Sequence, residues 1–212
     1  MSTQNQKTLA AYEKAAKEYL KGAKVFGADE AKWTRSFISD FLSRVPKCSR
    51  VLEVGAANGD NAKFIHELGY EVTASDISGD FLSAIKKNGL EPIRFNILLD
   101  DFPGKYRAIF CWKVFVHFTK DDTLNALEKS YGALEDGGVL AFCFIDKSCK
   151  NTGSEWADFP GVFHIGADRY FQYYSKDEMN AIIKKTKFAI TSCRSHTLGN
   201  GVTWLTYILE KK

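Results

Sequence analysis

Paired cysteines are missing from this sequence. Its five cysteines are an odd number, none belongs to a Cys-x-x-Cys pair, and their spacing is irregular. Disulfide scaffolds and zinc clusters both depend on regularly spaced cysteines. The pattern therefore argues against a secreted disulfide-rich protein and favours a reducing cytoplasm.

Long apolar runs are missing as well. No stretch approaches the roughly 18 apolar residues of a membrane span, and residues 1–20 carry charges throughout, without the apolar segment of a signal peptide. We therefore expect a soluble, unprocessed cytoplasmic protein that has no membrane partner.

The chain also lacks an excess of charge of one sign. Lys and Arg number 29 against 26 Asp and Glu, for a formal net charge of +3. Proteins that bind nucleic acid usually concentrate positive charge, so nucleic acid is not expected as a partner. The four histidines are scattered and no acidic pair accompanies them at a ligand-like spacing, so no metal site is predicted.

What the chain does have is the pattern of one α/β domain. A length of 212 residues, 45% of them apolar, suits one sizeable core. Two amphipathic helices are expected near 8–21 and 33–42, and from residue 50 short apolar runs alternate with helical segments, as in βαβ units. The expected strands are 51–54, 71–74, 92–95, 108–112 and 139–145, with helices at 61–68, 79–87 and 120–134, the last ending at a diglycine. An aromatic loop, a helix from residue 175 and a hairpin of strands 188–195 and 203–209 complete the prediction.

The segment VLEVGAANGD at 51–60 is the first candidate for a ligand site. It places Glu53 in a buried strand, Gly55 and Gly59 in the following turn, and a helix start after them. Glycines let the backbone approach a ligand closely, and a helix start offers unpaired N–H groups. The alternative is an ordinary tight βα turn.

Asp76 strengthens the ligand interpretation. It follows the next strand, at 76 − 55 = 21 residues after Gly55, where a carboxylate can accept both hydroxyls of a ribose. The alternative is an aspartate that only caps the following helix. A nicotinamide dehydrogenase would need the spacing G-x-G-x-x-G, which positions 55, 57 and 59 do not supply.

Over essentially its whole length the chain resembles the class I S-adenosylmethionine-dependent methyltransferases, of the type that acts on small molecules or peptides. Their first strand usually reads E/D-x-G-x-G-x-G, matched by Glu53, Gly55 and Gly59, with Ala57 in place of the middle glycine. The segments AIFCWKVFVHFT at 108–119 and LEDGGVLAF at 134–142 are similar to the family's fourth strand with its loop and to its fifth strand.

The resemblance implies a Rossmann-like, mostly parallel sheet of seven strands in the order 3-2-1-4-5-7-6, with helices on both faces. It implies a single methyltransferase domain over 1–212, in which 1–46 form a helical lid, 47–145 the cofactor-binding core, 146–174 a substrate loop, and 175–212 the final helix and hairpin. S-adenosyl-L-methionine is the implied cofactor. Asp76 would hold its ribose, Ile77 would pack on adenine, and Asn96 would meet the adenine amino group. The expected cofactor-binding residues are Tyr19, Glu53, Gly55, Ala56, Ala57, Gly59, Asp76, Ile77, Asn96, Ile97, Cys111 and Trp112.

His117 is the candidate catalytic base. It lies just beyond the fourth expected strand, at the edge of the sheet where doubly wound folds bind ligands, and its ordinary pKa suits removal of a proton from a hydroxyl. The alternative is a histidine that only hydrogen-bonds the loop beneath the cofactor.

The candidate substrate-binding residues are aromatic or cationic. Tyr12 and Tyr19 share one face of the first helix, which in relatives with a similar opening covers the cofactor and substrate; the alternative is packing on the core. Arg169 is suited to clamp a carboxylate, although a surface ion pair is the commoner fate of an arginine. The set is Tyr12, Lys113, His164, Arg169 and Tyr173.

Three functions follow from these residues. The first is O-methylation of a small molecule or short peptide, with a carboxylate as one candidate acceptor group, because the candidate pocket mixes aromatic rings and cations. The second is N-methylation of a small amine or a protein terminus, held against ring faces. The third is a non-catalytic protein that binds S-adenosylmethionine. A monomer or weak homodimer is expected in each case.

Overall fold

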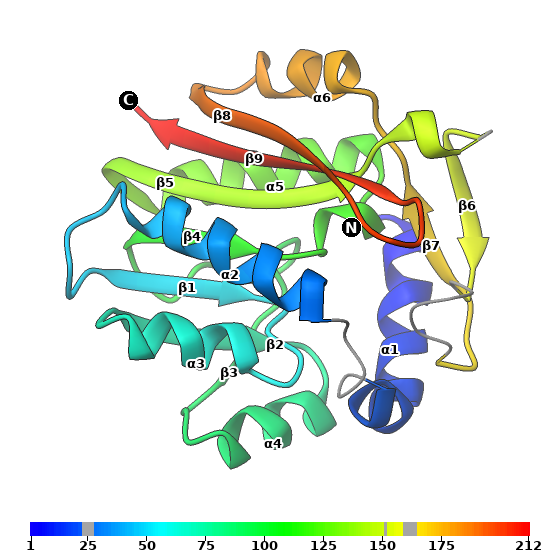
Figure 1. Cartoon of the computed structure of the whole chain (residues 1–212), viewed down its shortest axis with the longest axis horizontal. Helices are drawn as coiled ribbons and strands as arrows, with labels where there is room; N and C mark the ends of the chain where they lie inside the picture. The colour runs from blue at the N-terminus through cyan, green and yellow to red at the C-terminus, as the bar shows by residue number, and fades with distance from the viewer. Residues whose placement is uncertain (23–27, 151, 159–164) are drawn as a thin grey trace.

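A central sheet of seven strands organises the protein in the computed structural model, which describes residues 1–22, 28–150, 152–158 and 165–212 (Figure 1). The strands of this sheet are β1 (Arg50–Val54), β2 (Glu71–Asp76), β3 (Ile93–Arg94), β4 (Tyr106–Cys111), β5 (Leu134–Ile145), β8 (Phe188–Thr197) and β9 (Thr203–Lys211). The helices are α1 (Thr3–Gly22), α2 (Ala28–Leu42), α3 (Asp60–Glu67), α4 (Gly79–Lys87), α5 (Lys120–Ala133) and α6 (Lys176–Ile183), with short 3-10 helices η2 (Phe115–His117) and η3 (Lys147–Cys149).

The spatial order of the strands is β3-β2-β1-β4-β5-β9-β8. Strands β1 to β5 pair in parallel, and β9 is antiparallel to both β5 and β8. When the strands of this sheet are counted alone, the order is 3-2-1-4-5-7-6, so the predicted fold is confirmed. Order reverses between β1 and β4, which is where doubly wound sheets bind ligands.

Alternation along the strands explains why helices cover both faces of the sheet. In β5, Leu140 and Phe142 pack in the core formed with α5 and α6, whereas Ala141 and Cys143 pack in the core formed with α2. All four side chains are fully buried. Successive side chains of a strand point to opposite faces, so an uninterrupted apolar run such as 139–145 marks a strand covered on both sides.

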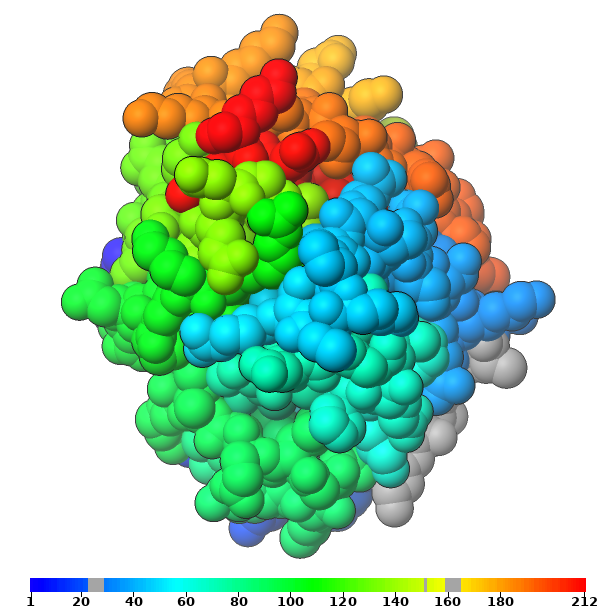
Figure 2. Space-filling view, turned by 90° about the vertical axis from the view of Figure 1, so that its left-hand side faces the viewer, coloured from blue at the N-terminus to red at the C-terminus, as the bar shows by residue number. Residues whose placement is uncertain are grey.

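The two N-terminal helices have different places in the fold. Phe37, Ile38 and Phe41 of α2 are buried against the sheet, so α2 is a core helix. Helix α1 instead contacts β7, α4 and η2, beyond the ends of the parallel strands. Figure 2 views the end where those strands begin, and α1 shows only at its margins. The segment 1–46, which we expected to act as one lid, is therefore divided, and only α1 lies over the ligand end of the sheet.

Three local expectations differ from the structure. The expected aromatic loop 146–174 contains a second sheet, in which β6 (Ser154–Ala157) pairs antiparallel with β7 (Arg169–Gln172). Helix α5 ends at Ala133 and the diglycine lies inside β5, in an irregular part of its pairing with β4. The third strand has two residues only. Among the described residues, no helix combines the length and apolar character that crossing a bilayer requires.

Candidate active site

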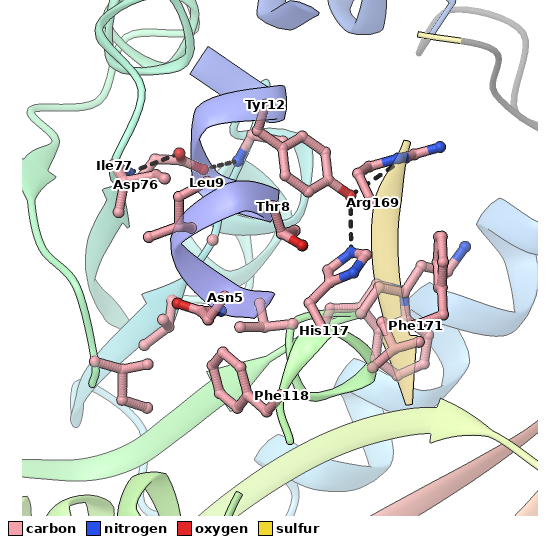
Figure 3. Close-up of a pocket in the computed structure, with 18 of the residues that line it drawn as sticks. Asn5, Thr8, Leu9, Tyr12, Asp76, Ile77, His117, Phe118, Arg169 and Phe171 are labelled. Atoms are coloured by element: carbon pink, nitrogen blue, oxygen red, sulfur yellow. Dashed lines mark hydrogen bonds between the residues drawn. The ribbon is translucent and has the colours of Figure 1, made fainter. Parts of the chain in front are cut away.

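A cavity of about 200 Å³ lies at the carboxyl ends of β1, β2 and β4, beneath α1 (Figure 3). Its wall also includes η2, β7 and the turn between β8 and β9. The residues expected to bind cofactor or substrate that line it are Tyr12, Tyr19, Gly55, Ala57, Asp76, Ile77, Asn96, Ile97, Trp112, Lys113, His117 and Arg169. Folding thus brings most of the predicted site residues together at one place, although their individual roles stay predictions.

The turn after β1 needs glycine at its first position. Gly55 has a φ of +72°, and a Cβ there would lie 2.6 Å from Cγ2 of Val114. Left-handed backbone and a clash with a stiff β-branched side chain both disfavour any other residue. Ala57, in place of the middle glycine, also has a positive φ of 49°. Its N–H donates to Oδ2 of Asp76 at 2.9 Å, which helps hold this conformation.

Asp76 joins the glycine turn to the next strand. Its Oδ1 accepts from the backbone N–H groups of Ile77 and Ser78 at 2.7 and 3.1 Å, while Oδ2 accepts from Ala57. Burial raises the pKa of Asp76, and these three hydrogen bonds oppose the rise. Each carboxylate oxygen accepts about two hydrogen bonds, so Oδ2 retains acceptor capacity at the wall of the cavity.

Four predicted cofactor residues lie behind the wall of the cavity as the described residues define it: Glu53, Ala56, Gly59 and Cys111. Glu53 is 1% exposed, and burial raises its pKa to about 8. Its Oε2 atom has no hydrogen-bond partner within the described part of the chain. These residues therefore lie outside the cavity wall. The Glu53 carboxyl accepts from the side chain of Asn61 and the N–H of Ala62, and these bonds oppose the rise in its pKa.

The side chain of Asn96 forms a hydrogen bond within the turn that follows β3. Its Oδ1 accepts from the N–H of Leu98 at 3.0 Å, and its Nδ2 lies 3.7 Å from the sulfur of Met1. The side chain thus lines the cavity while both ends of its amide contact the protein.

His117 forms a hydrogen-bonded chain with Tyr12. Nδ1 of His117 lies 2.7 Å from the carbonyl oxygen of Tyr170, and Nε2 lies 2.9 Å from the hydroxyl of Tyr12. A carbonyl only accepts, so Nδ1 carries the proton in the neutral ring and Nε2 accepts from Tyr12. Figure 3 shows this pair between α1 and β7. The histidine therefore faces a tyrosine hydroxyl, and both residues line the cavity.

Both cations proposed for an anionic substrate have carboxylate neighbours. Arg169 is 4% exposed, and its NH2 lies 3.2 Å from Oδ1 of Asp158. Its guanidinium also lies 5.4 Å from the ring centre of Tyr12. Lys113 pairs with Glu30 and lies over the ring of Trp204. These pairs reduce the positive charge that either side chain offers to a ligand.

Two predicted substrate residues are not placed in the cavity. Tyr173 is fully buried, and its hydroxyl donates to Glu155, so it packs the loop region instead of lining the cavity. Tyr173 lies four residues after Arg169 and just beyond the end of β7 at Gln172, past the part of the strand whose side chains line the cavity. His164 lies outside the described residues.

Two groups stand out among the lining residues that were not predicted from the sequence. Asn5, Thr8 and Leu9 come from the first turns of α1, and the helical spacing that they share with Tyr12 was an available signal. The second group comes from the turn of the β8–β9 hairpin and the start of β9 and had no local signal: Leu198, Asn200, Val202 and Trp204. Within the described ranges, no group of three or more His, Cys, Asp or Glu residues is placed to hold a metal ion.

The protein is expected to lose stability as the pH falls below about 6.5, because His117 is buried in neutral form. Burial, with a smaller contribution from Arg169, lowers its pKa from 6.5 to about 4, against the opposing bond to Tyr170. Between pH 6.5 and about 4 the unfolded chain binds a proton at this histidine and the folded chain does not. The stabilisation is therefore complete above pH 6.5 and is lost as the pH falls towards the folded-state pKa of about 4. The shift corresponds to about 3 kcal/mol.

Urea unfolding between pH 4 and 7 measures this effect. His117→Asn, whose amide can still donate to the Tyr170 carbonyl, should lose less stability on acidification than the wild type. His66→Asn, at an exposed position of α3, controls for the substitution itself. Equal acid dependence in the wild type and His117→Asn would contradict the expectation.

The fold and the cavity define a class of protein before any comparison is made: a Rossmann-like protein that binds a nucleoside cofactor at the reversal point of its sheet. Comparison with known families then identifies it. The model of the methyltransferase domain family matches residues 28–192, and the chain therefore belongs to that family. Its fold is that of the class I methyltransferases, whose cofactor is S-adenosyl-L-methionine.

Similar proteins agree with this assignment. Glycine/sarcosine N-methyltransferase of Halorhodospira halochloris is 25% identical over 146 residues, which are 63% of this chain and 50% of that protein. The match thus spans half the length of this curated relative. The structure of 1,6-didemethyltoxoflavin-N1-methyltransferase from Burkholderia thailandensis, with its substrate and S-adenosylhomocysteine bound, has a TM-score of 0.74 at 14% identity, covering 100% of this chain and 92% of that one. Magnesium protoporphyrin IX methyltransferase from Synechocystis has a TM-score of 0.66 at 16% identity, covering 86% and 84%. These two likenesses concern the fold.

Proposed function

We propose that this protein transfers a methyl group from S-adenosyl-L-methionine to a small, uncharged acceptor whose reacting atom, in the first instance a hydroxyl oxygen, carries a proton. The hydrogen bond between Tyr12 and His117 inside the cavity is the observation that carries this proposal. It places a proton acceptor next to a hydroxyl in the wall of the cavity.

The residues of the cavity suit the cofactor. Gly55 and Ala57 keep the turn free of bulk, Oδ2 of Asp76 can accept a ribose hydroxyl, and Ile77 offers an apolar face for adenine. The unpartnered Oε2 of Glu53 leaves a buried polar group close to this turn in the sequence. When bound, the cofactor would supply an electrophilic methyl group on a positively charged sulfonium.

An anionic acceptor is less well supported than the sequence suggested. Arg169 pairs with Asp158, and Lys113 pairs with Glu30. A carboxylate ligand would compete with these internal carboxylates at both positions. The remaining wall is largely aromatic and apolar and includes Trp112, Phe171, Val202 and Trp204. A neutral acceptor avoids both the competition and the cost of burying another charge.

The enclosure of the site favours a small molecule over a peptide. Elements far apart in the chain bound the cavity: α1, η2, β7 and the turn between β8 and β9. A peptide would need an extended groove or edge strand to receive its backbone. A compact ligand needs neither.

The proton of the acceptor has a path through Tyr12. The acceptor would donate its proton to the Tyr12 oxygen as the tyrosine donates its own to Nε2 of His117. Nδ1 of His117 keeps its bond to the Tyr170 carbonyl throughout. Methyl transfer would remove a positive charge from the sulfonium, and proton uptake by His117 would return one to the same cavity, so the net charge there would be conserved during the transfer. This matters because an uncompensated buried charge is costly. Because the pKa of His117 is lowered to about 4, it would hold the proton only transiently.

N-methylation of a small amine is the second candidate. The glycine/sarcosine N-methyltransferase of Halorhodospira halochloris and the N1-methyltransferase of Burkholderia thailandensis are both named for transfer to nitrogen. A primary or secondary amine also loses a proton on methylation, so the Tyr12–His117 pair would serve it equally. The aromatic rings of the cavity suit a planar or cationic nitrogen compound.

Binding and product analysis together test the proposal. Calorimetry with S-adenosylmethionine and S-adenosylhomocysteine should show binding of both. Incubation with panels of alcohols, phenols, carboxylic acids and amines should then give a product heavier by 14 mass units from a hydroxyl compound, or from an amine under the second candidate. Binding with no methylated product across the panels would favour a non-catalytic role, and binding of neither nucleoside would refute the proposal.

Tyr12→Phe is expected to lower kcat at least about 100-fold with a hydroxyl acceptor, because it removes the link between the acceptor and His117. The affinity for S-adenosylhomocysteine should change by less than about threefold, since this tyrosine acts on the acceptor. Single-turnover kinetics and calorimetry measure the two effects. Tyr70→Phe is the matched control, because Tyr70 is also buried and donates to one backbone carbonyl, that of Leu42, outside the cavity. An unchanged kcat in Tyr12→Phe would remove the proton path.

A further inference from the structure

Asn5 has an unused hydrogen-bonding group inside the candidate active site. The residue lines the cavity, yet its side chain is only 1% exposed. Its Oδ1 atom has no hydrogen-bond partner among the residues that the structure describes. A buried amide oxygen without a partner costs about 1–3 kcal/mol. A ligand that donates a hydrogen bond there would recover that cost.

The position of Asn5 on α1 indicates which part of a ligand it meets. Leu9 follows Asn5 by four residues and so lies on the same face of the helix. Leu9 lines both the main cavity and a neighbouring hollow that Ile77 and Asn96 share. Figure 3 shows Asn5 between Leu9 and Phe118 on the cavity side of α1. Asn5 therefore lies one helical turn from Leu9, in the cavity that Ile77 and Asn96 also line.

The residue expected to read adenine already makes contacts within the protein. Oδ1 of Asn96 accepts from Leu98, and Nδ2 of Asn96 lies against the sulfur of Met1. The amide of Asn96 thus stabilises its own turn and the start of α1. The amide oxygen of Asn5 lies in the same cavity with no such engagement.

We propose that Asn5 recognises the adenine ring of the cofactor through its side-chain amide; this inference rests on the proposed function. Oδ1 would accept from the 6-amino group, while Nδ2 would donate to a neighbouring ring nitrogen. This side-by-side donor and acceptor is the pattern by which asparagine reads adenine edges elsewhere. The first turn of α1 then belongs to the cofactor site, and Asn5 is the specificity residue for the base.

Calorimetry with two ligands tests this role: S-adenosylhomocysteine, and its analogue that carries purine without the 6-amino group. The wild type should prefer S-adenosylhomocysteine by about tenfold or more. Asn5→Ala should weaken binding of S-adenosylhomocysteine by about tenfold and binding of the analogue by less than about threefold. Asn180→Ala, on α6 away from the cavity, is the control for losing an asparagine side chain.

The paired ligands separate recognition from folding. Equal loss of affinity for both ligands in Asn5→Ala would mean a structural role for Asn5 and would overturn the proposal, as would wild-type affinity for S-adenosylhomocysteine. If the wild-type protein bound neither ligand, the proposed function itself would fail. If the wild type bound S-adenosylhomocysteine but Asn5→Ala left the discrimination between the two ligands unchanged, the cofactor site would be supported and the proposed role of Asn5 would be refuted.

Discussion

Asp76→Ala is expected to weaken cofactor binding at least about 100-fold, because it removes the proposed acceptor for the ribose hydroxyls. The same change leaves the N–H groups of Ala57, Ile77 and Ser78 without their carboxylate acceptor. We therefore also expect the free energy of unfolding to fall by about 3 kcal/mol. Calorimetry with S-adenosylhomocysteine and urea unfolding measure the two effects separately.

A second aspartate provides the control for Asp76. Asp146 accepts from the backbone N–H of Ser148 at the start of η3, and it does not line the cavity. Asp146→Ala should lower stability slightly and leave cofactor affinity as in the wild type. If Asp76→Ala reduced stability while binding the cofactor normally, Asp76 would be a structural residue only.

Gly55→Ala is expected to weaken cofactor binding at least about tenfold and to destabilise the protein by about 2–4 kcal/mol, combining left-handed strain with overpacking. The new methyl group would lie 2.6 Å from Cγ2 of Val114, and both residues line the cavity. Relief of the clash must move Val114 or the turn itself, and either movement alters the surface that receives the cofactor.

Two further variants separate strain from overpacking. Gly69 also has a positive φ, +87°, but a Cβ there meets no atom within 4 Å in the described structure. Gly69→Ala should therefore show the cost of the backbone conformation alone and leave cofactor binding intact. Adding Val114→Ala to Gly55→Ala should restore part of the lost stability. Absence of any such recovery would show that Val114 is not the source of the clash.

The strands of the sheet and the helices between them were predictable because the sequence patterns that mark them are local. Apolar runs such as 139–145 mark strands covered on both faces, and the helical segments between them follow a period near 3.6. The end of α5 was not predictable in the same way. The diglycine at 137 and 138 reads as a helix stop, yet Leu134 pairs with Tyr106 and draws the segment into β5. That pairing joins residues 28 positions apart.

The second sheet was missed for a related reason. Strands β6 and β7 have four residues each, too few to show an alternation. Their stability depends on distant partners: β7 contacts α1, and the N–H of Tyr170 donates to the hydroxyl of Thr8. Such a contact between residues far apart in the chain leaves no periodic trace near either residue.

The candidate site likewise contains residues that the sequence predicts and contacts that it does not predict. Gly55, Ala57 and Asp76 were predictable because a turn after a strand fixes where its residues lie, and parallel strands end at one edge of the sheet. Arg169 was predictable as a cavity residue, but its pairing with Asp158 and its place over Tyr12 were not. Which carboxylate pairs with a cationic side chain depends on the folded arrangement, and the sequence does not show which carboxylate will lie near it.

The sequence by itself determined the α/β class and the end of the sheet where a ligand belongs, because hydrophobic period and turn chemistry act over short stretches of chain; the family and the strand order came from its resemblance to known methyltransferases. Only the tertiary structure decided which polar groups are satisfied. It placed the proton of His117 on Nδ1, occupied Asn96 with its own turn, and left the amide oxygen of Asn5 without a partner in the described structure. Hydrogen bonding and burial depend on which distant segments of the chain come into contact. In this protein, such contacts form the part of the site that is proposed to select its ligands.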